Sequence, residues 1–101
     1  MLNIEKTIEN GALNFALGGE LNTLTVKELK KEVDSSIVSA TSVTFDLKEL
    51  EYISSAGLRL FLTTQQTMEE RELPTVTVKN ANEVILEILS ITGFDKILDL
   101  Q

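Results

Sequence analysis

Apolar and polar residues alternate in several stretches of the chain, and this alternation is typical of β-strands buried on one face. It predicts four strands, at about residues 2–8, 12–18, 42–47 and 75–78. The inward positions of the last three strands are occupied by Leu13, Phe15 and Leu17, by Val43, Phe45 and Leu47, and by Val76 and Val78. The opposite positions hold Ala12, Asn14 and Ala16, then Thr44 and Asp46, then Thr75 and Thr77.

Apolar residues at helical spacing predict three helices between and after these strands. The first runs from about residue 26 to 38 on Val26, Leu29, Val33 and Ile37, with Thr25 and Glu28 forming a capping box. The second begins near "SS" at 54–55, ends before "ELP", and carries a stripe of Leu58, Phe61, Leu62 and Met68 with Gln65 inside it. The third follows "NANE" at 80–83, a second capping-box candidate, and contains Val84, Ile85, Ile88 and Leu89 before Gly93, which suits a C-terminal cap.

These elements predict a two-layer α/β sandwich with the order β-β-α-β-α-β-α. Alternating strands indicate a mixed sheet with helices packed on one face, since strands covered on both faces are near-continuously apolar. Asn10-Gly11 predicts a tight hairpin between the first two strands, and the β-α-β units should be right-handed. We expect one domain over residues 1–101, with "KILDL" at 96–100 as a short last element of open type.

The amino-acid composition limits the kinds of chemistry and the kinds of partner that are expected of this chain. The chain has no cysteine and no histidine, so it lacks thiolate chemistry and the usual general base near neutral pH. Its net charge of −7 argues against nucleic acid and anionic membrane as partners. No apolar run approaches the length of a membrane span, and the N-terminus lacks a secretory pattern, so we expect a cytoplasmic protein. We expect no enzyme activity, no cofactor and no metal, and we interpret the carboxylates of Asp46, Glu49 and Glu51 as solvated.

Two connections should hold any site, because both follow strands at the carboxyl edge of the sheet. One is "GGELNTLT" at 18–25, whose glycine pair is a weak signal for a phosphate loop and more typical of turn geometry. The other is "LEYISSAG" at 50–57. Either serine of this segment could cap the second helix, and either could have a chemical role. Gly57 is unfavourable in a first turn, but it keeps the helix start uncrowded for an approaching protein.

Three segments carry a resemblance to a known family. They are "GGELN" at 18–22, "VTFDLKELEYISSAGLRLFL" at 43–62 and "ILEILSITGFDKIL" at 85–98. With them the chain resembles a STAS domain, and in particular the bacterial anti-sigma factor antagonists, over essentially its whole length.

The resemblance implies a partner-switching regulator of sigma-factor-dependent transcription. The serine two positions before the motif glycine, here Ser55, would be phosphorylated by an anti-sigma factor that is a serine kinase. The unphosphorylated protein would bind that anti-sigma factor, phosphorylation would break the complex, and a separate serine phosphatase would restore it. Two departures concern the binding face: Ser54 and Asn22 stand where many members have Asp. Ser54 is therefore a second candidate acceptor.

The expected partner-binding set joins both connections to the start of the second helix. Leu60 points well away from the apolar stripe, so we assign it with Arg59 to this face. The full set is Glu20, Asn22, Thr23, Ser54, Ser55, Gly57, Arg59 and Leu60. Two alternatives remain open: a constitutive STAS scaffold or subunit of a larger signalling or transport assembly, and a small enzyme or nucleotide binder, which the missing histidine, cysteine and phosphate loop disfavour.

Overall fold

The computed structural model describes residues 1–101, and its elements follow the predicted order with one strand added at the end. In chain order they are β1 (Leu2–Glu9), β2 (Ala12–Leu21), α1 (Val26–Ser36), a 3-10 turn (Ile37–Ser39), β3 (Ser42–Ile53), α2 (Ser55–Glu70), β4 (Thr77–Lys79), α3 (Glu83–Ile91), a second 3-10 turn (Phe94–Lys96) and β5 (Asp99–Leu100).

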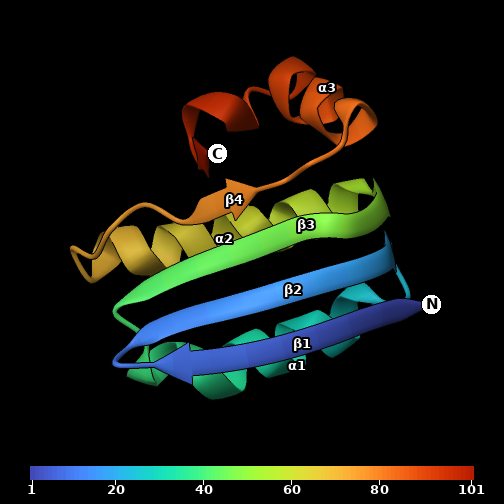
Figure 1. Ribbon diagram of the computed structural model, residues 1–101. Helices are drawn as coiled ribbons and strands as arrows, with labels where there is room; N and C mark the ends of the chain where they lie inside the picture. The colour runs from blue at the N-terminus through green and yellow to red at the C-terminus, as the bar shows by residue number, and fades with distance from the viewer.

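The strands form one five-stranded sheet in the order β1-β2-β3-β4-β5. β1 pairs antiparallel with β2, and the other neighbours are parallel, so the sheet is mixed as predicted. The hairpin between β1 and β2 turns at Asn10 and Gly11, which both have positive φ (51° and 86°). Figure 1 shows α1 and α2 behind the sheet and α3 beyond β4, and the connections through α1 and α2 are right-handed.

A single apolar core joins the inner face of the sheet to all three helices. The predicted inward residues of β2 and β3 are buried, and the rings of Phe15, Phe45 and Phe61 stack at centroid distances of 5.6 Å and 4.4 Å. Gln65, which interrupts the apolar stripe of α2, is also buried, and its Oε1 accepts a hydrogen bond from the backbone N–H of Val76 at 2.8 Å. The prediction of two layers with helices on one face is confirmed.

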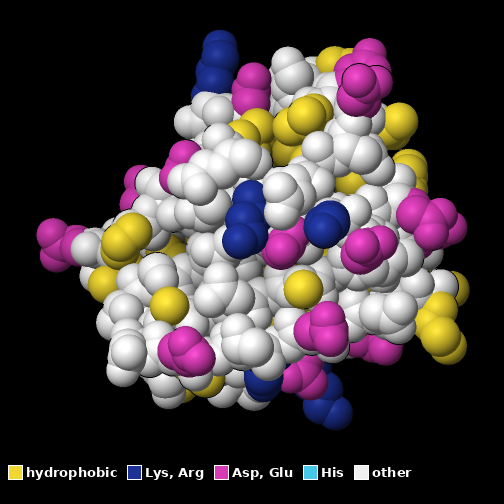
Figure 2. Space-filling view, viewed as in Figure 1, with side chains coloured by type: hydrophobic (Ala, Val, Ile, Leu, Met, Phe, Trp, Pro, Cys, Tyr) yellow, Lys and Arg dark blue, Asp and Glu magenta, His cyan; other side chains and the backbone are white.

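The opposite face of the sheet is not covered by a helix (Figure 1). Figure 2 looks onto this face and shows basic and acidic side chains next to one another near its centre. Asp46 lies there, and its Oδ1 accepts hydrogen bonds from Asn80 Nδ2 at 3.0 Å and from the Lys48 backbone N–H at 3.1 Å. The bond from Asn80, more than the others, holds the pKa of Asp46 below its ordinary value. No three His, Cys, Asp or Glu side chains are grouped as metal ligands.

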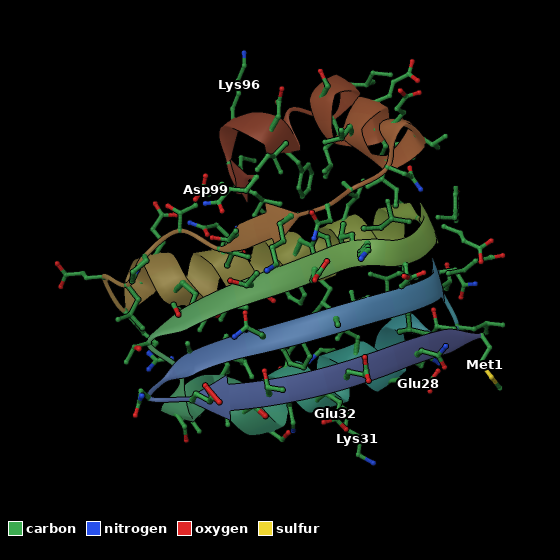
Figure 3. All side chains as sticks on the ribbon, in the orientation of Figure 1. Met1, Glu28, Lys31, Glu32, Lys96 and Asp99 are labelled. Atoms are coloured by element: carbon green, nitrogen blue, oxygen red, sulfur yellow. The ribbon has the colours of Figure 1, made fainter.

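An ion pair ties the edge strand β1 to α1. Lys6 Nζ lies 2.8 Å from Glu32 Oε1 and donates to Ser36 Oγ at 2.9 Å. The hydrogen bond and the charge of Lys6 lower the pKa of Glu32. In Figure 3, Glu32 lies with Glu28 and Lys31 on the side of the molecule opposite α3, so α1 closes the core along the β1 edge.

Several strand ends differ from the predictions. β2 continues to Leu21 and β3 to Ile53, whereas the sequence pattern placed loops there. The reason is a pair of register irregularities between β2 and β3, at Ala16/Gly18 and Gly19/Glu20 of β2. At each of them β3 has one residue more than β2, so pairing continues while the alternation of β3 breaks. β4 is shorter and later than predicted, and "KILDL" ends in the two-residue strand β5.

Both predicted capping boxes are wrong. The Thr25 side chain makes no cap at α1, because its Oγ1 donates to the Glu20 carbonyl at 2.8 Å and accepts from the Asn22 N–H at 2.8 Å. At α3 the cap is Asn82 and not Asn80. The predicted C-terminal cap is confirmed: Gly93 follows α3 in the left-handed region with φ 82°.

Candidate functional site

The two connections singled out in the sequence meet at the carboxyl edge of the sheet, at the right-hand end of β2 and β3 in Figure 1. Glu20 pairs with Tyr52 and Leu21 with Ile53 in the parallel ladder. The Ser54 backbone N–H then donates to the Leu21 carbonyl at 2.9 Å. The prediction that these segments are spatial neighbours is confirmed.

The turn from Glu20 to Thr25 is fixed by its own hydrogen bonds. Asn22 Oδ1 accepts from the N–H groups of Leu24 at 2.9 Å and Thr25 at 3.0 Å. These bonds use an acceptor oxygen that an Asp side chain would also supply, so Asn22 keeps the turn without the charge. Thr23 and Leu24 are left exposed at the tip of the turn.

The glycine pair before this turn serves backbone geometry and forms no phosphate loop. Gly19 has φ 89°, and a Cβ there would collide with the Met1 carbonyl oxygen. Both facts restrict this position of β2, which lies beside a register irregularity with β3, to glycine. In place of the predicted turn, the glycine pair lies within strand β2, with Gly19 in the left-handed region.

Ser54 and Ser55 differ in accessibility at the start of α2. Ser55 is the first residue of the helix and is exposed. Ser54 occupies the N-cap position, but its side chain makes no cap hydrogen bond, and its Oγ is buried without any partner. The interpretation of these serines as side-chain caps is therefore wrong, and the freely accessible hydroxyl is that of Ser55.

Gly57 is buried and does not belong to an accessible face, contrary to prediction. A Cβ at this position would lie 2.8 Å from both Ile53 Cγ1 and Leu21 Cγ. The glycine lets the first turn of α2 pack closely onto the ends of β2 and β3, which accounts for its place in a helix.

Leu60 is also a correction, because only 6% of it is exposed. The helical-wheel argument assumed that α2 has one buried stripe. In fact α2 packs against α1 as well as the sheet, and Leu60 lines a cavity together with Val33 of α1 and Ile37 of the 3-10 turn that follows it. Leu62, which was assigned to the stripe, is half-buried, whereas Arg59 is exposed as expected.

Two residues at this edge were missed. Leu24 is 79% exposed at the tip of the turn, and Tyr52 is 45% exposed at the end of β3. The signal for Leu24 was present, since it is a lone leucine in the polar segment "NTLT". Tyr52 could not be found, because it lay in a segment read as a loop. We call the exposed set the docking edge; it consists of Glu20, Thr23, Leu24, Tyr52, Ser55 and Arg59.

The chain belongs to the STAS domain family, whose model matches residues 3–101. It is similar to the anti-sigma-B factor antagonist of Staphylococcus aureus, with 26% identity over 98 residues that cover 96% of this chain and 90% of that protein. The recognition of this family from the sequence motifs is confirmed.

Solved structures share the fold. An anti-sigma factor antagonist from Mycobacterium paratuberculosis has a TM-score of 0.83 at 18% identity, covering 99% of this chain and 85% of that one. The phosphorylated form of the Bacillus cell fate determinant SpoIIAA has a TM-score of 0.76 at 16% identity, covering 100% of this chain and 91% of that one.

None of the helices of this structure is both long enough and apolar enough to cross a bilayer.

Proposed function

We propose that this STAS domain is an anti-sigma factor antagonist of the cytoplasm. Its docking edge binds an anti-sigma factor that is a serine kinase and so releases a sigma factor. Phosphorylation of Ser55 ends this binding, and a serine phosphatase restores it. The observation that carries the proposal is an accessible hydroxyl, on Ser55, in the middle of a rigid edge that also exposes Leu24 and Tyr52.

Exposed apolar side chains beside fixed backbone are suited to docking, because they bury area on contact at little ordering cost. The S. aureus relative carries the same role in its name. SpoIIAA, which shares the fold, is known in a phosphorylated form. Ser54 is the poorer acceptor in this structure, since its Oγ is buried.

In the proposed switch the Ser55 Oγ attacks the γ-phosphorus of ATP bound to the kinase. The bond to the β-phosphate oxygen breaks, ADP leaves, and a base of the kinase takes the hydroxyl proton. The product adds a charge of about −1.5 to −2 to the docking edge near neutral pH. Placed opposite like charges or apolar groups of the partner, this charge costs several kcal/mol of binding.

The test first isolates an anti-sigma factor kinase by co-purification with the chain and then uses it with variants. Ser55→Ala should abolish phosphorylation and leave binding intact, whereas Ser55→Asp should weaken binding while the domain stays folded. Ser54→Ala is the matched control and should retain most phosphorylation, read by phosphopeptide mapping. Phosphate found mainly on Ser54, or binding that ignores every change at Ser55, would overturn the switch. The second result would favour a constitutive scaffold.

A further inference from the structure

A groove runs between α1 and α2 and begins at Ser55. It has a volume of about 420 Å³ and is lined by Val26 and Lys30 of α1 and by Ser55, Ala56, Arg59, Leu60 and Thr63 of α2. Leu60 and Val26 are buried or half-buried, so the base of the groove is apolar. The polar atoms around it belong to Ser55, Thr63 and two basic side chains.

The charge of this groove is opposite to that of the molecule. The chain has 16 acidic and 9 basic residues, yet the groove is lined by two basic residues and no acidic one. Arg59 takes part in neither of the two ion pairs of the structure. Lys30 pairs with Asp34 at 2.6 Å, but both side chains are more than half exposed (63% and 59%), and such pairs contribute little. Both cations can therefore turn to an anion in the groove.

Ser55 and Arg59 are one helical turn apart, at i and i+4 of α2. An anion at i with a cation at i+4 is the favourable orientation for such a pair. We propose that the groove receives the phosphoryl group on Ser55 and that Arg59 and Lys30 hold it by charge-assisted hydrogen bonds. This inference rests on the proposed function, because it assigns a binding site in the same chain to the product of the switch.

We call the proposed binding of the phosphoryl group by Arg59 and Lys30 the clamp. It changes the chemical groups that the docking edge presents to a partner. Before phosphorylation, Arg59 extends from the exposed surface of α2 and is available to a partner. After phosphorylation, its guanidinium is engaged with the phosphate. The partner then meets an added dianion and loses a cation, so one modification changes two features of the edge.

The experiment installs phosphoserine at position 55 during translation, so it needs no kinase. The second pKa of the phosphate, ordinarily about 6, is measured by ³¹P NMR titration in the full chain. Two nearby cations should lower it by about 0.5–1 unit, and Arg59→Gln or Lys30→Gln should each recover part of that shift. Lys27→Gln removes one positive charge from α1 outside the groove and is the matched control.

Thermal unfolding provides a second readout. Arg59→Gln should leave the Tm of the unphosphorylated chain unchanged and lower that of the phosphorylated chain. A phosphate pKa that is the same with and without Arg59 and Lys30, or that shifts equally in Lys27→Gln, would overturn the clamp. Either of these two results would overturn the clamp without contradicting the proposed function. Conversely, failure of a kinase to modify Ser55 would contradict the proposed function without affecting the NMR titration, because the phosphoserine is installed during translation.

Discussion

Helices α2 and α3 begin in opposite ways, although each follows one of the parallel strands of the same mixed sheet. At α3, Asn82 Oδ1 accepts from the Ile85 N–H at 2.8 Å, its Nδ2 donates to the Leu50 carbonyl at 3.1 Å, and Glu83 places an acidic group in the first turn. At α2, the side chain of the N-cap residue Ser54 makes no hydrogen bond, and the first turn contains no acidic residue.

The difference shows where each helix gets its stability. α3 is closed by local capping, which satisfies one of its free N–H groups within the chain. α2 leaves its first turn open and depends on packing instead, with Leu58, Leu60 and Phe61 all buried within two turns of Ser55. An open helix start can accept a phosphate or a partner without first losing a cap.

The largest expected effect comes from removing that packing. Leu60→Ala should destabilise the domain by about 2–5 kcal/mol, because it leaves a cavity between α2 and α1. Urea unfolding measures the free energy. Leu86→Ala on α3 is the control, since Leu86 is 42% exposed and should change stability little. Equal small losses in both variants would mean that Leu60 is not core.

A smaller loss is expected at the start of α3. Asn82→Ala should cost about 1 kcal/mol of unfolding free energy, because the Ile85 N–H loses its acceptor. Asn82→Asp keeps an acceptor oxygen and should retain most of the stability. If Asn82→Ala proved neutral in the same urea measurement, the contrast between the two helices would lose its basis.

The connection into α3 should respond to pH through Asp46. Because the folded-state pKa of Asp46 is lowered, its contribution to stability is present above the unfolded-state pKa and is lost as pH falls through the folded-state value. Asn80→Ala removes the main cause and should raise the pKa of Asp46 toward its ordinary value, with a stability loss smaller than that of Asn82→Ala. NMR titration of the Asp46 carboxyl measures this directly, and an unchanged pKa would contradict it.

The smallest effect is expected at Ser54. Its buried Oγ has no hydrogen-bond partner, and such a hydroxyl stabilises nothing. Ser54→Ala should therefore be neutral or slightly stabilising in urea unfolding. A loss of about 1 kcal/mol would instead be the signature of a helix cap, and α2 and α3 would then begin alike.

Sequence patterns predicted the inner face of the sheet well, because alternation at Phe15 and Phe45 depends on burial alone. The sequence patterns failed for residues whose surroundings are set by a second element of the fold. Leu60 is buried where α2 meets α1, and a helical wheel drawn for one helix does not include a neighbouring helix. Thr25 and Glu28 have the spacing of a capping box, but the Thr25 hydroxyl is engaged by Glu20 and Asn22, whose position depends on the end of β2.

The candidate site was predicted in its location and only partly in its members. Ser55 and Arg59 are exposed as expected, and the meeting of the two connections follows from strand direction. The sequence predicts that Gly57 leaves space for a partner, whereas Leu21 and Ile53 of the protein itself fill that space. Tyr52 was missed because the bulges that extend β3 leave no pattern in the sequence.

The self-bonded turn from Glu20 to Thr25 has a consequence for the rate and entropy of association. Asn22 already holds the backbone of Leu24 and Thr25 in the free protein. A partner that docks there meets a formed surface, so no segment must fold before contact is productive, and little conformational entropy is lost. Association should then be limited by orientation and charge, and differences in affinity among variants of this edge should appear mainly as differences in dissociation rate.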